Sequence, residues 1–585
     1  MTEFFEIHER DGAARLSELR LSDPLVGPSN VSPVVRDAGS SWVADRSRPA
    51  PDPAALTVLP HRAAPAGTDP RVAETFATER EPLEGPTAAV VTADTASDLG
   101  MDVYVLSGAP GLVDHTEAFL DSIMRTRRSI PEDSGLYLAG CATPANVAAL
   151  VYAGVDLVDG DHAYLRGTQG VYLTRDGQRQ LAELEELPCQ CPACQHGLSE
   201  MDRRGCAEHN VNALETQLAT VRDRIRVGGL RDFLEGQARH RIFPTEVLRR
   251  LDGEYRYLEQ RAPVYRRRDM RACSEDTLRR VEIRRFAARL TSRYRPAFTD
   301  RPLVIVPCSA GKPYSESTSH GQFHDAIRWR AHKLSLTSPL GIVPQEFEFT
   351  YPAQQYDTVV TGHWSETEIA FISDVLTRYL ETADYPEVIA HVPPGGYRSI
   401  VERTAASLDG AAFRFTVEDH PTTDRSLGAL SDALAGLDRY GKREREHNTL
   451  RAIADYFLGS GAGAALFGTA LRTDGRLPKL RAHVDGTHMA TLVPQYGSLS
   501  FTLAGARYWR ESDAPDKRVA IDAFVPKGSV LAPGIIDADE QIRVGDEVIV
   551  EGPSAFGVGR ATMPGPMMAS ATRGMAIEVR HAETR

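Results

Sequence analysis

Lysine is scarce in this chain, and so are aromatic residues and long apolar runs. Six lysines stand among 67 basic residues, which leaves 61 arginines, and aromatic residues make up only 7%. No stretch approaches the ~20 consecutive apolar residues of a membrane-spanning helix. The first residues are acidic, whereas a secretory signal carries lysines followed by an apolar run. These absences predict a cytoplasmic protein that does not enter a membrane.

The net charge of −13 does not by itself exclude a nucleic-acid partner. An acid-rich, lysine-poor composition resembles that of proteins from salt-loving archaea, which are acidic whatever their function. A local basic patch is therefore the more informative signal. The densest patch runs from Arg266 to Arg295, where arginines recur at helical spacing. It suits contacts with phosphates, although the interleaved acids equally allow a salt-bridged helix in water.

A chain of 585 residues is too long for one core. Apolar strand-like runs alternate with helical segments, which predicts parallel α/β sheets and makes a barrel plausible. Strands are expected at 88–92, 103–107, 135–139, 155–158, 303–306, 340–343, 388–392 and 413–417, with a helix from Thr143 to Tyr152. Residues 40–86 are predicted to be a loose insertion. We expect a multidomain α/β protein divided at 1–295, 296–440, 441–512 and 513–585.

A candidate metal site is the first chemical motif. Seven cysteines are an odd number for a disulfide framework, and three of them lie within six residues: Cys189, Cys191 and Cys194. With His209 they form a Cys3His set that suits tetrahedral Zn²⁺ and leaves no open coordination position, so we expect a structural zinc site. Free cysteines on a surface loop, or Cys206 in place of His209, are the alternatives.

This motif, followed by His209-Asn210, resembles the zinc site of tRNA-guanine transglycosylases, over roughly residues 85–295. Gly154-Val-Asp-Leu-Val-Asp159 resembles the strand that ends in that family's nucleophilic aspartate. The resemblance implies a (β/α)8 barrel with a zinc-binding subdomain. The family's Asp-Ser-Gly-x-Phe-Gln loop, which supplies the second aspartate, is absent here. Asp159 is therefore expected to bind substrate RNA without base exchange.

A second motif follows the predicted strand 303–306. It is Pro307-Cys-Ser-Ala-Gly-Lys-Pro-Tyr-Ser-Glu-Ser-Thr-Ser-His320. Such a run gathers a thiol, an ammonium, a phenol, hydroxyls and an imidazole at a strand's carboxyl end, where α/β sheets bind ligands. We expect catalytic roles for Cys308, Lys312, Tyr314 and His320, and substrate binding by Ser309, Ser317, Ser319 and Glu346. The loop His391–Tyr397 is a further candidate for the same crevice. A solvated Ser/Thr-rich turn, with Cys308 as a small buried residue, is the alternative.

The second motif resembles the signature of archaeosine synthases. The resemblance implies a tRNA substrate carrying 7-cyano-7-deazaguanine in its D-loop, and addition of an amine to the nitrile, with lysine the favoured donor. A radical S-adenosylmethionine partner subunit then cleaves the adduct, and the formamidine is the product that remains on the tRNA. In this chemistry Cys308 beside Lys312 would form a covalent thioimidate. His320 would relay a proton, and Tyr314 or Lys312 would stabilise the imide nitrogen.

The C-terminal stretch, from about residue 515, alternates short strands with glycine turns and resembles a PUA domain, which implies tRNA binding. A generic small β-barrel is the alternative. Two other functions remain open for the whole chain: an active tRNA-guanine transglycosylase and a non-catalytic tRNA-binding protein. The oligomeric state is also open, with a homodimer as one option.

Overall fold

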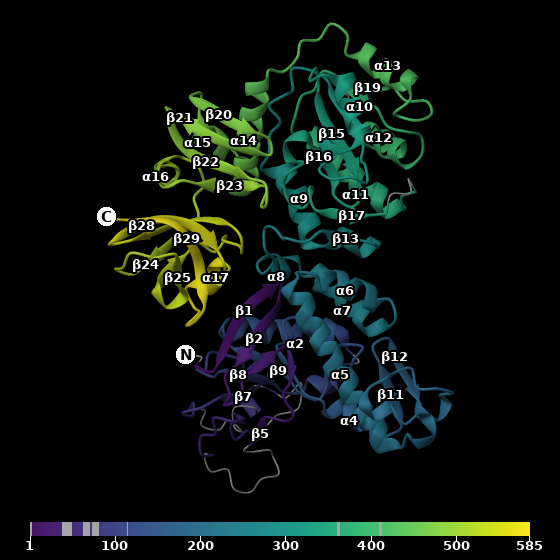
Figure 1. The fold of residues 1–585 in the computed structure, drawn as a ribbon, viewed down its shortest axis with the longest axis vertical. Coiled ribbons are helices and arrows are strands. Elements are labelled where there is room, and N and C mark those ends of the chain that lie inside the picture. Colours follow the sequence, from purple (N-terminus) through teal and green to yellow (C-terminus); the bar gives the residue numbers. More distant parts are fainter. Residues whose placement is uncertain are drawn as a thin grey trace. The chain divides into compact units, whose positions relative to one another are not determined.

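The computed structural model describes residues 3–37, 49–61, 69, 71–72, 81–113, 115–359, 363–408 and 412–585 (Figure 1). Internal contacts divide the chain into two compact units. The first comprises Met1–Pro263, Leu531–Ile535 and Met563–Ala576, and the second comprises Val264–Val530, Ile536–Thr562 and Ile577–Arg585. No helix within these described ranges is long and apolar enough to cross a membrane.

A seven-stranded parallel sheet forms the centre of the first unit, in the order β4-β10-β9-β8-β7-β6-β5. Its strands are β4 (Ser29–Asn30), β5 (Val35–Asp37), β6 (Leu56–Val58), β7 (Thr87–Val91), β8 (Val103–Leu106), β9 (Gly135–Leu138) and β10 (Leu157–Val158). β8 and β9 are buried along their whole length, as parallel strands covered on both faces must be. Only residues 31–34 separate β4 from β5, the two ends of the order, so the sheet curls into a barrel-like form.

The barrel-like sheet confirms the predicted fold class, with two local differences. Helix α3 (Val147–Tyr152) begins after the expected Thr143 cap. The reason is that the Asn146 side chain accepts from the Thr143 amide at 2.8 Å and donates to the Cys141 carbonyl at 2.9 Å, which folds this stretch into a turn. Strand β6 lies inside the expected loose insertion 40–86, much of which falls outside the described residues.

The rest of the first unit surrounds this sheet. Strands β1 (Phe5–Asp11), β2 (Ala14–Leu19) and β3 (Leu25–Gly27) form an antiparallel sheet. Arg15 of β2 binds the buried Asp156 carboxylate, with Nε to Oδ1 at 2.8 Å, and so fixes β2 beside β10. The remaining elements are η1 (Ala109–Leu112), α2 (Thr116–Ser129), α4 (Asp161–Thr168), β11 (Val171–Thr174), β12 (Gly177–Gln180), η2 (Leu181–Glu183), η3 (Pro192–Cys194), η4 (Leu198–Glu200), α5 (Arg203–Arg226), α6 (Leu230–Ala238), α7 (Ile242–Gly253) and α8 (Tyr255–Glu259).

A second α/β sheet organises the first part of the second unit, in the order β16-β15-β14-β18-β19. Only β16 is antiparallel to its neighbour. The expected strands correspond to β14 (Leu303–Pro307), β16 (Gly341–Pro344), β18 (Val388–Ala390) and β19 (Phe413–Phe415), whereas β15 (His332–Thr337) was not predicted. Its companions are β13 (Met270–Ala272), η5 (Glu275–Arg279), α9 (Val281–Ser292), η6 (Tyr314–Glu316), α10 (Thr318–Ile327), η7 (Gln345–Phe347), β17 (Tyr356–Thr358), α11 (Glu366–Leu380), α12 (Gly396–Ser407) and α13 (Asp424–Ala433).

Two further sheets, of four and six strands, follow in the second half of the chain. The first, β20-β21-β22-β23, packs with α14 (Lys442–Leu458), α15 (Ala462–Phe467) and α16 (Leu503–Glu511), and its strands are β20 (Leu471–Arg476), β21 (Lys479–Val484), β22 (Thr487–Val493) and β23 (Ser498–Phe501). The second follows the order β25-β29-β28-β27-β24-β26. It contains β24 (Arg518–Ile521), β25 (Ser529–Leu531), β26 (Ile535–Ala538), β27 (Glu547–Gly552), β28 (Ala555–Ala561) and β29 (Met575–Thr584), with η8 (Ala532–Gly534) and α17 (Gly565–Met568) between strands. This agrees with the predicted C-terminal β-domain.

Candidate functional site

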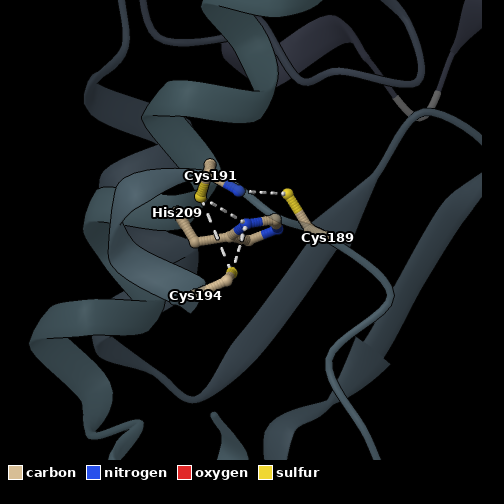
Figure 2. Close-up of side chains that lie close together, drawn as sticks. All are labelled: Cys189, Cys191, Cys194 and His209. Atoms are coloured by element: carbon tan, nitrogen blue, oxygen red, sulfur yellow. Dashed lines mark hydrogen bonds between the residues drawn. The ribbon is translucent and has the colours of Figure 1, made fainter. Parts of the chain in front are cut away.

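Cys189, Cys191, Cys194 and His209 converge in the first unit, although His209 lies fifteen residues beyond the last cysteine (Figure 2). Their ligand atoms all lie within 4.8 Å of one another. The 3-10 helix η3 presents Cys191 and Cys194, and α5 presents His209. The cluster is therefore consistent with a metal site, because the three thiols and the imidazole are gathered together and not scattered along a loop.

The distances fit a tetrahedral ion. Zn–S bonds of about 2.3 Å and a Zn–N bond of about 2.0 Å place ligand atoms roughly 3.5–3.8 Å apart. The observed separations are 3.6 Å between the Cys191 and Cys194 sulfurs, and 3.5 Å and 3.3 Å from these sulfurs to His209 Nδ1. Burial raises the pKa of Cys194 to about 12 when no cation is present. A bound cation would reverse that preference, because it stabilises thiolates.

The surroundings of the cluster orient His209. Its Nε2 donates to the Leu173 carbonyl at 2.8 Å, which leaves Nδ1 as the atom that faces the sulfurs. The Tyr172 ring stacks on the imidazole at 3.8 Å. Asn210, the next residue, is fully buried and binds the Leu173 amide and the Ala163 and Val171 carbonyls, so it joins β11 to α4 and α5. Cys206 is buried next to this cluster but is not among the four grouped ligands.

Cys308 lies at the carboxyl end of the central strand β14. The chain runs from β14 to β15 on one side and later to β18 on the other, which makes this end the switch point of the sheet, where α/β proteins bind ligands. The Cys308 amide donates to the Leu336 carbonyl at 3.1 Å. The half-buried Cys308 sulfur lies 3.1 Å from the hydroxyl of Tyr397, on the first turn of α12 after β18.

Tyr397 was expected only as part of a loop near the crevice, and the structure singles it out. Burial and the neighbouring Cys308 raise the pKa of the Tyr397 phenol, so it stays protonated and can donate to the sulfur. The Trp364 ring packs against Tyr397, with the ring centres 4.4 Å apart. Sequence reasoning had no way to pair Cys308 with a residue 89 positions away. The Gly-Gly-Tyr sequence at a strand end was the available signal.

Lys312 is half-buried in the loop that follows Cys308. Its Nζ lies 4.1 Å from the centre of the Tyr356 ring, in a cation–π contact. Burial lowers the pKa of Lys312, while charges on Cys308, Asp357 and Asp269 act in the opposite direction. A lysine with a lowered pKa exchanges its proton more readily than one in water.

Tyr314 and His320, which follow Lys312 in the chain, are both buried. Tyr314 is buried and its hydroxyl hydrogen-bonds that of Tyr356, which also contacts Thr337 Oγ1 at 2.6 Å. The His320 ring stacks on Tyr314 with centres 4.8 Å apart and donates from Nε2 to the Pro307 carbonyl at 3.1 Å. Burial lowers the pKa of His320 to about 3. A ring that is neutral and 1% exposed suits holding the loop in place better than relaying protons.

The predicted substrate-binding residues fall in different places. Ser309 Oγ donates to the Gly311 carbonyl at 3.0 Å, and Ser317 caps α10 while donating to the Tyr314 carbonyl at 2.9 Å. Ser319 is half-buried on the first turn of α10. The structure does not bring Glu346 to Cys308. Glu346 is buried near the amino end of β15, where it contacts His332 at 3.0 Å and Asn448 at 2.6 Å.

Glu346 is remote from Cys308 because of strand register. His332 pairs with Leu303 at the start of β14, whereas Cys308 follows the end of that strand. Five residues along a strand span roughly 16 Å. Sequence reasoning assumed that every residue after a strand lies on one edge, but β16 runs antiparallel and delivers Glu346 to the opposite edge.

Asp159 follows β10 in the first unit and is 2% exposed. Its carboxylate accepts from the Gly140 amide at 2.6 Å, the Tyr137 hydroxyl at 3.0 Å and the Asp161 amide at 3.2 Å. Burial raises the pKa of Asp159, and this effect outweighs the hydrogen bonds, which lower it. A pocket of about 430 Å³ opens nearby, lined by Gly140, Cys141, His162 and Arg241 among others.

The arginines of the basic run at 266–295 differ in exposure, because Arg267, Arg271, Arg279 and Arg295 are exposed and others are buried. On α9, Arg285 and Arg289 are buried, and Arg289 lies 5.3 Å from the Tyr456 ring centre. Arg266 forms an ion pair with the buried Glu282 at 2.9 Å. The ion pair with Glu282 fits the salt-bridged alternative for Arg266, and phosphate contacts by the exposed arginines stay a prediction.

Comparisons with known proteins agree with this architecture. Family models match residues 88–242 (queuine tRNA-ribosyltransferase), 283–434 (a domain of unknown function, DUF5591), 448–516 (patch-forming domain C2 of tRNA-guanine transglycosylase) and 517–582 (PUA domain). The Cys308 site lies in the second of these, and the metal cluster in the first. The PUA match confirms the predicted C-terminal domain type.

Full-length relatives carry one function. An archaeosine synthase of Haloferax volcanii is 55% identical over 100% of both chains, and an archaeosine synthase subunit alpha of Methanosarcina acetivorans is 38% identical, again over 100% of both. A tRNA-guanine(15) transglycosylase of Methanobrevibacter smithii is 26% identical over 78% of this chain and 68% of its own. The chain therefore belongs to the archaeosine synthase family, whose members are enzymes that act on tRNA.

Proposed function

We propose that this archaeosine synthase adds an amine to the nitrile of 7-cyano-7-deazaguanine in the D-loop of tRNA, with lysine as the favoured donor. The observation that carries the proposal is the Cys308–Tyr397 contact at the switch point of the second α/β sheet, with Lys312 in the same loop. A nucleophile, a hydrogen-bond donor and an acid–base group thus meet where such sheets bind ligands.

The first step that this site supports is covalent. A nitrile carbon is a weak electrophile until its nitrogen is hydrogen-bonded or protonated. The Cys308 thiolate attacks that carbon and forms a C–S bond, the C≡N triple bond becomes a C=N double bond, and the Lys312 ammonium gives a proton to the nitrile nitrogen. Because burial lowers the pKa of Lys312, its ammonium is a stronger acid than a lysine in water. The product is a thioimidate with Lys312 neutral.

The second step releases the enzyme. The amine attacks the thioimidate carbon to form a C–N bond, the C–S bond breaks, and the Cys308 thiolate leaves. Neutral Lys312 takes the proton that the attacking amine loses, which restores the ammonium. The phenol of Tyr397 donates to the departing sulfur. Tyr314 and His320 position the loop from below, and Ser309 and Ser317 shape its backbone.

In this proposal the first unit supports binding and not the chemistry. Cys189, Cys191, Cys194 and His209 would hold a Zn²⁺ ion, which supplies a structural cross-link between η3 and α5. Four protein ligands leave no position for an activated water. Asp159 is fully engaged by neighbouring donors, which suits a positioning role next to bound RNA. The PUA domain would add affinity for tRNA.

The adduct would pass to a radical S-adenosylmethionine partner subunit. That subunit would cleave the adduct, so that the formamidine remains on the tRNA. Mass spectrometry of nucleosides from nitrile-bearing tRNA, incubated with the protein and lysine, tests the step assigned to this chain. We expect a nucleoside heavier by one lysine. Unmodified nitrile after complete incubation with every amine tried would overturn the proposal. Incorporation of labelled guanine into unmodified tRNA would instead establish a transglycosylase.

A further inference from the structure

The connection between α6 and α7 carries a cationic surface that the proposed chemistry does not use. Two hollows meet there and share Arg241: the pocket of about 430 Å³ at the carboxyl edge of the barrel-like sheet, and a shallower one of about 590 Å³. The second is lined by Arg239, His240, Ile242, Arg249 and Arg250 among others. We call the surface around these two hollows the α7 arginine surface.

A rigid scaffold holds this surface. Gln237, at the end of α6, donates from Nε2 to the carbonyls of Pro144 and Arg175, both at 3.2 Å. The connection is thus tied to the turn after β9 and to the β11–β12 turn. Gly177 leaves room for Arg241, since a Cβ at Gly177 would come within 3.3 Å of Arg241 Nη1. The arginines are therefore presented from fixed backbone.

Charge pairing divides the arginines into two groups. Arg250 is committed to Glu246 at 3.0 Å and to Glu117 at 2.9 Å. Arg239 and Arg241 are exposed, and across the ranges that the structure describes no carboxylate lies within ion-pair distance of either. Two guanidinium groups without an ion-pair partner among the described residues therefore line the second hollow, two residues apart in the chain.

We propose that the α7 arginine surface binds the phosphate backbone of the substrate tRNA through Arg239 and Arg241. Guanidinium groups match phosphate oxygens in pairs of parallel hydrogen bonds. Ile242, whose side chain is 84% exposed, supplies an apolar contact for a ribose or a base beside them. The adjoining pocket then faces the nucleotide whose phosphates are held. Phosphate contacts of this kind position a nucleic acid without reading its sequence.

The test is tRNA binding by the full-length protein over a series of salt concentrations. Each lost phosphate contact lowers the slope of log affinity against log salt by about 1. The double variant Arg239→Gln/Arg241→Gln should therefore bind tRNA roughly ten- to a hundredfold more weakly at low salt and lose about 2 from that slope. Arg204→Gln is the matched control, because Arg204 is exposed but already paired with Glu208 at 3.1 Å.

Two readouts keep the outcome clear. Metal content and thermal stability of the double variant should equal those of the wild type, since both side chains are exposed. Unchanged tRNA affinity and salt slope in a folded double variant would overturn the proposal. Weaker binding of the double variant to a simple polyanion such as heparin, together with unchanged binding to tRNA, would also overturn it. Because binding is measured without turnover, failure of the chemistry proposed at Cys308 would leave this test unaffected.

Discussion

The hydroxyl of Tyr397 lies 3.1 Å from the sulfur of Cys308, across two strand ends that are 89 residues apart in the chain. A hydrogen bond to a charged group contributes about 1.5–3 kcal/mol. Tyr397→Phe should therefore slow amine addition by roughly ten- to a hundredfold, with a nearly unchanged KM for tRNA. Tyr385→Phe is the control, because Tyr385 contacts His332 at the other edge of the same sheet. Equal rates for both variants would show that the contact has no catalytic role.

Cys308→Ser tests the covalent route. Without lysine, the wild-type protein should accumulate a cross-link to nitrile-bearing tRNA that is visible as a mass shift on the intact protein, and the variant should not. Steady-state amine addition should fall by more than about a hundredfold, since a hydroxyl is a far weaker nucleophile than a thiolate. Activity within about tenfold of the wild type would exclude an obligatory thioimidate.

Lys312→Ala and Asp159→Asn together locate the chemistry. Loss of a group that stabilises the transition state typically costs ~10²–10³ in rate, and we expect that loss for Lys312→Ala with tRNA affinity preserved. Asp159→Asn keeps the shape of a buried side chain that holds Gly140 and Tyr137. In Asp159→Asn the rate of amine addition per folded molecule should fall by less than about tenfold. The opposite pattern, measured by single-turnover kinetics, would place the active site in the first unit.

His320 should make stability depend on pH. Its pKa is lowered by burial from 6.5 to about 3 in the native state. Below pH 6.5 the unfolded chain therefore binds a proton that the native state does not, and the free energy of unfolding falls as pH falls. At about 1.4 kcal/mol per unit, the loss between pH 6.5 and 5 is roughly 2 kcal/mol.

His320→Asn should remove that dependence, although it will be less stable at pH 7.5 because the stack on Tyr314 is lost. Urea unfolding of both proteins at pH 7.5 and 5.0, followed by fluorescence, measures the difference. Parallel losses of stability in the two proteins would show that His320 is accessible to protons in the native state.

Cys191→Ser should lose about one equivalent of zinc and lower the melting temperature of the first unit. Cys206→Ala is the matched control, because Cys206 is a buried neighbour of the cluster but lies outside the four grouped ligands. It should retain the metal. Elemental analysis by mass spectrometry gives both results, and full zinc content in Cys191→Ser would remove the site assignment.

The sequence by itself determined the parts of this protein that depend on short spacing. The thiols at 189, 191 and 194 are close because so little chain separates them, and an apolar run followed by Cys308 predicts a nucleophile at the end of a buried strand. The alternation of strands and helices likewise predicted parallel sheets. In each case the information lies within a few residues, where covalent geometry limits the possible arrangements.

Only the tertiary structure decided which distant groups meet and which side chains face water. Tyr397 reaches Cys308 because β18 pairs with β14, whereas Glu346 is carried away by the antiparallel β16. The arginines of α9 have the spacing of an exposed basic face, yet packing against α14 buries Arg289. Arg239 and Arg241, outside this run, are exposed. Strand order and burial arise from the packing of the whole chain, and no local pattern of residues encodes them.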